Sequence, residues 1–154
     1  MSTSLLYHAL GLVGYQYLKT KFENGKVIIS IQKNPSKLCC PDCESSRFIR
    51  HGVITRTFKT LPIGKKPILL QVQIQRIQCL ECCCLKQEKL YFADPKKTYT
   101  HAFERYILGL VKMMTIQDVA HHLGISWNTV KDIQKRYLQQ NFSKPKWLVS
   151  LSNH

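Results

Sequence analysis

The chain has 154 residues, with 23 Lys and Arg against 9 Asp and Glu, so its formal net charge is +14 at pH 7. This length suits one domain or two small ones, and 44% hydrophobic residues exclude wholesale disorder. No stretch has the ~20 apolar residues of a membrane-spanning helix. Residues 5–18 lack the basic start and the cleavage site of a signal peptide. The cation excess indicates a polyanionic partner, above all nucleic acid, and the expected location is the cytoplasm.

Alternating residues predict strands in the first half of the chain. Residues 14–33 are expected to form a β-hairpin with its turn at Asn24-Gly25. The clearest strand is 67–78, in which Leu, Val and Ile alternate with Gln. Ile77 breaks this alternation and indicates a bulge or twist just before Cys79.

Turn residues divide the region between these strands. Residues 47–60 predict two short strands around a turn at His51-Gly52, and residues 61–64 predict a break. Residues 94–97 predict a linker, after which the apolar spacing becomes helical.

Seven cysteines cluster in two short segments, which is typical of metal binding rather than of a secreted disulfide framework. Two Cys-x-x-Cys pairs, separated by 35 residues, can supply the four thiolates of a tetrahedral structural zinc site. The expected ligands are Cys40, Cys43, Cys79 and Cys82. Cys39 remains an alternative to Cys40, and Cys83 or Cys84 an alternative to Cys82.

Residues 115–137 have the pattern of a DNA-binding helix-turn-helix. Thr115 with Asp118 predicts the start of the first helix, Gly124 its end, and Ser126 the start of the second. The expected inward-facing residues are Val119, Leu123, Val130, Ile133 and Tyr137. The second helix is expected to read DNA in the major groove. Its candidate contacts are Trp127, Asn128, Thr129, Lys131, Gln134 and Lys135.

The predicted fold class is therefore α+β, with a β-rich zinc-knuckle module of the zinc-ribbon kind followed by a helical helix-turn-helix module. Four regions are expected: an N-terminal helix and hairpin region (1–38), a zinc-binding β module (39–93), a helix-turn-helix domain (98–142) and a C-terminal tail (143–154).

Three segments together resemble the first part of ISL3-family transposases of bacterial insertion sequences. They are CCPDCESSRFIRHG, RTFKTLPIGKKPILLQVQIQRIQCLEC and MTIQDVAHHLGISWNTVKDIQKRYL. The resemblance implies that a zinc knuckle and a helix-turn-helix recognise terminal inverted repeats, and that a DDE domain cuts and joins DNA. Nine scattered acidic residues and the end of the chain after WLVSLSNH provide no DDE triad, so a truncated, non-catalytic fragment is expected.

These features predict double-stranded DNA and structural zinc as partners, with no membrane association. A homodimer or association with full-length transposase is a further expectation, as is attachment to the bacterial nucleoid when DNA is bound. The alternative function is a small zinc-ribbon and helix-turn-helix transcription regulator.

Overall fold

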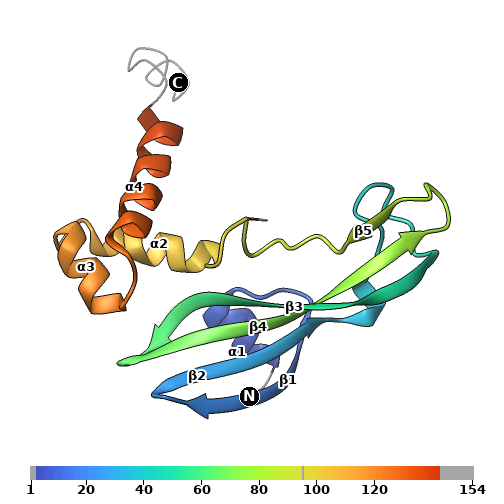
Figure 1. The fold of residues 1–154 in the computed structure, drawn as a ribbon, viewed down its shortest axis with the longest axis horizontal. Helices are drawn as coiled ribbons and strands as arrows, with labels where there is room; N and C mark the ends of the chain where they lie inside the picture. The colour runs from blue at the N-terminus through green and yellow to red at the C-terminus, as the bar shows by residue number, and fades with distance from the viewer. Residues whose placement is uncertain (1–2, 95, 143–154) are drawn as a thin grey trace. The chain divides into compact units, whose positions relative to one another are not determined.

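A computed structural model describes residues 3–94 and 96–142 (Figure 1). The chain divides into two compact units, residues 1–103 and 104–154, and each is described by itself. The tail expected at 143–154 lies outside the described residues. In the part of the chain that is described, no helix is both long and apolar enough to cross a membrane.

The elements follow one another as α1 (Thr3–Leu10), β1 (Tyr15–Glu23), β2 (Lys26–Lys33), the 3-10 helix η1 (Pro35–Lys37), β3 (Phe48–Ile63), β4 (Lys66–Cys79), β5 (Leu85–Gln87), α2 (His101–Leu110), α3 (Ile116–Leu123) and α4 (Trp127–Phe142).

The first unit is built on one five-stranded sheet. Its order is β1-β2-β4-β3, and the short strand β5 also pairs with β4. The expected hairpin is confirmed, because β1 and β2 pair antiparallel around Asn24 and Gly25. β2 pairs in parallel with β4, and β3 pairs antiparallel with β4 over most of its length. The sheet thus joins strands from both sides of the region boundary expected at residue 38.

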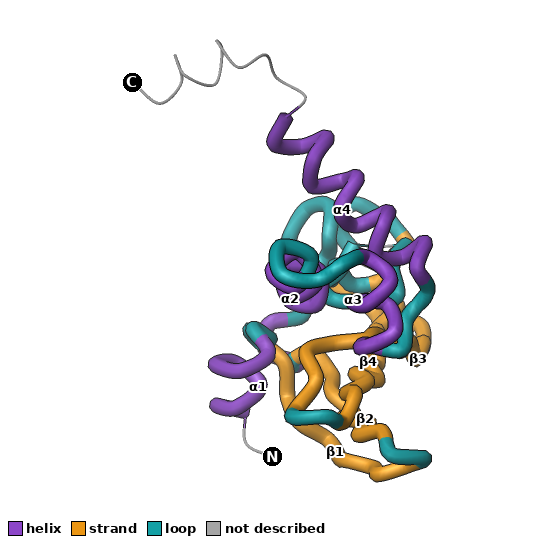
Figure 2. Tube along the Cα trace, turned by 90° about the vertical axis from the view of Figure 1, so that its left-hand side faces the viewer, coloured by secondary structure: helices purple, strands orange, loops and turns teal. Residues whose placement is uncertain are grey.

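One face of this sheet carries the main hydrophobic core. Alternate residues of β2, β3 and β4 point into it, since side chains along a strand alternate between the two faces. Leu6 and Leu10 of α1 pack against this face, as Figure 2 shows for the helix beside the strands. Phe92 packs on the same face, with its ring edge-on to those of Tyr15 and Phe58 at centroid distances of 5.2 and 5.3 Å.

β3 differs from the sequence expectation. Residues 48–60 lie in one continuous strand, whereas two short strands around a turn at His51-Gly52 were expected for 47–60. Strand pairing shifts register between Arg50 and Val53, so His51-Gly52 forms a β-bulge. The break expected at 61–64 is also wrong in part, because β3 continues to Ile63. In both places pairing with the long neighbour β4 prevails over the local turn tendency.

The irregularity expected near Ile77 lies where it was predicted, but the extra residue belongs to β3. Ile77 pairs with Arg50, at the edge of the bulge. Beyond it, the buried residues of β4 change parity: Ile74 belongs to the main core, whereas Ile77 and Cys79 form a second small core with Leu38. The bulge and the change of buried face therefore lead β4 into the cysteine region.

The second unit contains most of α2, together with α3 and α4. Its fully buried side chains include Ile107 of α2, Val119 of α3, and Val130 and Ile133 of α4. Tyr137 is 38% exposed, so the expectation that it faces inward is wrong. α4 has 16 residues against 8 for α3, and the shorter helix does not cover its whole length.

Candidate metal centre and nucleic-acid interface

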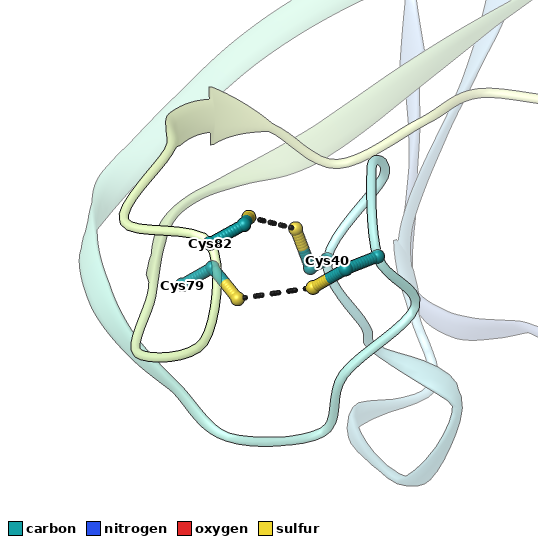
Figure 3. A group of neighbouring side chains, drawn as sticks. Cys40, Cys79 and Cys82 are labelled. Carbon is teal, nitrogen blue, oxygen red and sulfur yellow. Dashed lines mark hydrogen bonds between the residues drawn. The ribbon is translucent and has the colours of Figure 1, made fainter.

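Two similar loops at one end of the sheet bring four cysteines together. The first loop follows η1 and carries Cys40 and Cys43. The second begins at Cys79, the last residue of β4, and carries Cys82 on the way to β5. In Figure 3 the side chains of Cys79 and Cys82 point toward the loop that carries Cys40. The Sγ atoms of Cys40 and Cys82 are 3.5 Å apart, and those of Cys43 and Cys79 are 3.3 Å apart.

The four sulfur atoms fit a tetrahedral zinc ion. All of them lie within 4.8 Å of one another. Zn–S bonds of ~2.3 Å require sulfur–sulfur separations of about 3.8 Å in a tetrahedron. Two of the four cysteines, Cys40 and Cys79, are buried, while Cys43 and Cys82 are exposed. Four thiol ligands leave no coordination position for a reacting water, so the chemistry of this donor set is that of a structural site.

The two loops also share their backbone geometry. The N–H of Cys40 donates to the carbonyl of Ser45, five residues on, and the N–H of Cys79 donates to the carbonyl of Cys84, also five residues on. The residue after the second cysteine is left-handed in both loops, with φ of 58° at Glu44 and at Cys83.

The correspondence between the two loops gives two of the three remaining cysteines a counterpart that is not a cysteine. Cys83 occupies the place of Glu44, and Cys84 occupies the place of Ser45. Cys39 does not belong to the four-sulfur group. Cys84 contributes to a separate group with Asp42 and Cys82. Asp42 is already bound to Lys86, whose Nζ lies 2.8 Å from Oδ2.

Backbone donors favour the thiolate form at the second loop. The N–H groups of Cys82 and Glu81 lower the pKa of Cys79 to about 7, and the Glu81 nitrogen lies 3.3 Å from Sγ. A lowered pKa assists metal binding, because the thiolate rather than the thiol is the ligand. The Cys-x-x-Cys turn thus orients these N–H groups toward the first sulfur of the pair.

The start and the end of α3 are set by local capping. The Thr115 hydroxyl accepts a hydrogen bond from the N–H of Asp118 at 3.1 Å, as the sequence predicted. Gly124 ends the helix with φ of 64°, a conformation that favours glycine. The N–H of Ile125 then donates to the carbonyl of Ala120 and closes the turn.

α4 begins at a second cap, since the Ser126 hydroxyl accepts from the N–H of Asn128 at 3.2 Å. Further along, Arg136 donates to Glu104 of α2 at 2.7 Å, in a half-buried ion pair. This pair was not predicted from the sequence, because no spacing rule connects residues on separate helices. Together with the buried Val130 and Ile133, these contacts fix which face of α4 is exposed.

The exposed face of α4 carries most of the predicted DNA contacts. Trp127 is 43% exposed, and Nζ of Lys131 lies 4.8 Å from the centre of its ring. Asn128 and Lys135 are exposed, whereas Thr129 and Gln134 are half-buried. A shallow groove runs along this face and includes four of these side chains. It is lined by Ile116, Trp127, Lys131, Gln134, Lys135, Leu138 and Gln139.

Three of the groove residues were not predicted from the sequence. Leu138 follows Lys131 by seven residues and Trp127 by eleven, a spacing that returns to the same helix face. Helical periodicity could therefore have found Leu138. Ile116 belongs to α3, so its place in the groove depends on how α3 packs against α4.

Comparisons with known proteins match both structural features. The model of the zinc-finger of transposase IS204/IS1001/IS1096/IS1165 matches residues 37–83. The model of the helix-turn-helix domain of transposase family ISL3 matches residues 88–138. These matches show a zinc ribbon, for which the cysteine group supplies the ligand chemistry, and a DNA-binding helix-turn-helix.

A curated relative supports the same assignment. The chain is 25% identical over 121 residues to the transposase for insertion sequence element IS1001 of Bordetella parapertussis. The match covers 77% of this chain and 30% of the relative's length. No solved structure matches the chain significantly. The chain thus carries the zinc-finger and the helix-turn-helix domain of the ISL3 family of insertion-sequence transposases.

Proposed function

We propose that this chain recognises the terminal inverted repeats of an insertion sequence, and that α4 reads the bases. The observation that carries this proposal is the exposed face of α4, which presents Asn128, Lys131 and Lys135 from a helix capped at Ser126. Asn can pair bidentately with adenine, and Lys can contact guanine or phosphate. Cation excess over the whole chain, +14 by formal count, supplies the sequence-independent part of the affinity.

Within this proposal, Cys40, Cys43, Cys79 and Cys82 hold one structural zinc ion. The metal would supply folding energy to the end of the sheet, where the second small core contains few side chains. Thr129, half-buried in the first turn of α4, would contact a phosphate near the helix N-terminus. Trp127 and Gln134 would complete the surface that meets the bases.

We further propose that this stretch binds DNA without cutting it. The matched regions are binding domains, and the chain spans 30% of the length of the curated transposase that it matches. Strand cleavage would then depend on residues outside this sequence, and association with a second copy or with a complete transposase would bring them to the bound DNA.

The test is selection of bound sequences from a pool of random duplexes, followed by affinity measurements on the recovered site. Replacing Asn128 or Lys131 by Ala should cost about 1–3 kcal/mol on that site, because each change removes a base contact. For Asn128→Ala, the loss of affinity for random DNA should be much smaller than the loss of affinity for the selected site. Gln140→Ala, an exposed change on α4 outside the groove, is the matched control.

Two results would contradict the proposal. Equal losses on the selected site and on random duplexes would show that α4 does not read sequence. A recovered motif found singly upstream of genes, rather than as a pair of inverted repeats flanking an element, would favour the transcription regulator.

A further inference from the structure

A second pocket with a distinct chemistry lies in the first unit. It has a volume of about 450 Å³ and is bounded by the end of β2, by η1 and by the segment around Tyr91. Lys33, Lys37 and Tyr91 line it, as does Tyr15, which is 2% exposed. This volume is within the range of small-molecule sites in proteins.

The charge of the pocket favours an anion. Two lysines and no acidic residue are among the side chains that line it. A larger pocket in the same unit, of about 680 Å³, is lined by Asp42, Glu88 and Asp94 as well as by cations. Of these two pockets, only the smaller one therefore has purely cationic charged groups at its wall.

Tyr91 offers an aromatic face beside those cations. It is 65% exposed, although it flanks Phe92, which is buried in the main core. The Nζ atoms of Lys33, which lines the pocket, and of Lys89, which lines the larger one, lie over its ring at 5.1 and 5.6 Å from the centre. A stacked base would take the place of one of these cation–π contacts. An exposed ring with ammonium groups around it is the combination by which proteins hold unpaired nucleotides: the base stacks on the ring and the cations pair with phosphate.

Backbone and core contacts position the segments that carry the lining side chains. The N–H of Asn34 donates to the carbonyl of Gly14 at 2.8 Å, which joins the start of β1 to the end of β2. A Cβ atom at Gly14 would lie 3.2 Å from Cδ of Lys37, so glycine leaves room for the lysine stem against the pocket. The edge-on contact of Tyr15 with Phe92 anchors the segment that carries Tyr91.

We propose that this pocket binds one unpaired nucleotide, with the base on Tyr91 and the 5′-phosphate beside Lys33 and Lys37. The recognised chemistry is a nucleoside 5′-phosphate, carried either by a single strand or by a free nucleotide. This goes beyond duplex recognition by α4, because it uses other residues in the other unit and another form of nucleic acid.

The test uses the zinc-loaded full chain and a short oligothymidine that contains one 2-aminopurine, whose fluorescence falls when it stacks on an aromatic ring. The wild-type chain should bind the strand and quench the probe. Tyr91→Leu should abolish the quenching and weaken binding at least about fivefold, since a stacked base contributes substantially to affinity. Tyr91→Phe should preserve both signals. Lys33→Gln should weaken binding and reduce its dependence on salt.

Tyr7→Leu is the matched control, because Tyr7 is a 51% exposed tyrosine on α1 and is absent from the pocket lining. Wild-type quenching and affinity in Tyr91→Leu, with zinc content and circular dichroism unchanged, would overturn the proposal. So would equal losses in Tyr91→Leu and Tyr7→Leu.

Two further measurements distinguish a single strand from a free nucleotide as the ligand, and the pocket from α4 as the binding site. Thymidine 5′-monophosphate that restores the probe's fluorescence would identify a free-nucleotide site, and failure to compete, with Tyr91-dependent quenching intact, would identify a single-strand site. Lys131→Ala should lower duplex affinity and leave the quenching unchanged. Loss of quenching in Lys131→Ala would assign strand binding to α4 and overturn the proposal for the pocket.

Discussion

Contacts within the first unit join residues much farther apart in the sequence than the helix caps of the second unit do. In the first unit, β2 pairs with β4 some 40 residues away, and the paired sulfur atoms belong to residues 42 and 36 positions apart. In the second unit, the caps of α3 and α4 join residues two to five positions apart. One chain thus combines a module that depends on long-range strand pairing and metal chemistry with a module whose helix ends are set by local caps. In the second unit the Arg136–Glu104 ion pair, 32 positions apart, is a long-range contact beside those caps.

This difference can be measured because each unit has its own probe. Both tryptophans of the chain, at positions 127 and 147, belong to the second unit by sequence. Metal content and the absorption of cobalt-substituted protein report on the cysteine group of the first unit. Unfolding followed by these two signals should give separate transitions, so one two-state free energy would not describe the chain.

The largest effect is expected when one zinc ligand is removed from the first unit. Cys79→Ser removes one of the four sulfur ligands, so zinc should fall from about one ion per chain to near zero. The loss should destabilise this end of the sheet strongly, because structural zinc contributes on the order of 10 kcal/mol to folding. Hydrogen exchange should rise in residues 38–50 and 75–87, while tryptophan fluorescence of the second unit stays unchanged.

Cys83→Ser and Cys39→Ser are the matched controls for this prediction. Both should retain the metal, because neither thiol belongs to the four-sulfur group. Zinc loss in Cys83→Ser equal to that in Cys79→Ser would show that the correspondence between the two loops does not identify the ligands.

The next effect is the loss of a large side chain from the main core. Phe58 is fully buried in β3 and contacts the ring of Phe92, so Phe58→Ala should destabilise the first unit by about 3–5 kcal/mol. Chemical denaturation followed by circular dichroism at strand wavelengths measures this loss. A shift of the tryptophan transition by the same amount would contradict independent unfolding of the two units.

The smallest effect is expected at a cap of the second unit. Thr115→Ala removes the hydroxyl that accepts from Asp118 and should cost about 1 kcal/mol. The tryptophan transition should move to lower denaturant, whereas cobalt absorption should not change. Thr115→Ser keeps the acceptor and should restore most of the stability; failure to do so would show that the cap hydrogen bond is not the cause.

Much of the candidate site could be predicted from the sequence, since its motifs are short. Cys-x-x-Cys spacing, the Thr115 cap and Gly124 each depend on neighbours within a few residues. Prediction failed where distant residues compete with local preference. His51-Gly52 has the composition of a turn, yet its neighbours Arg50 and Val53 both pair with β4, so the dipeptide forms a bulge. Tyr137 keeps the helical spacing of a core residue, but its exposure depends on the length of the neighbouring helix.

By itself, the sequence determined the α+β class, the two knuckle motifs and the helix-turn-helix pattern, because backbone geometry and capping act over a few residues. Only the tertiary structure brought Cys40 and Cys43 to Cys79 and Cys82, and excluded Cys39 from that group. It also placed Tyr91 beside Lys33, although β3, β4 and β5 lie between them in the sequence. Such contacts depend on strand order and register, which no local pattern specifies.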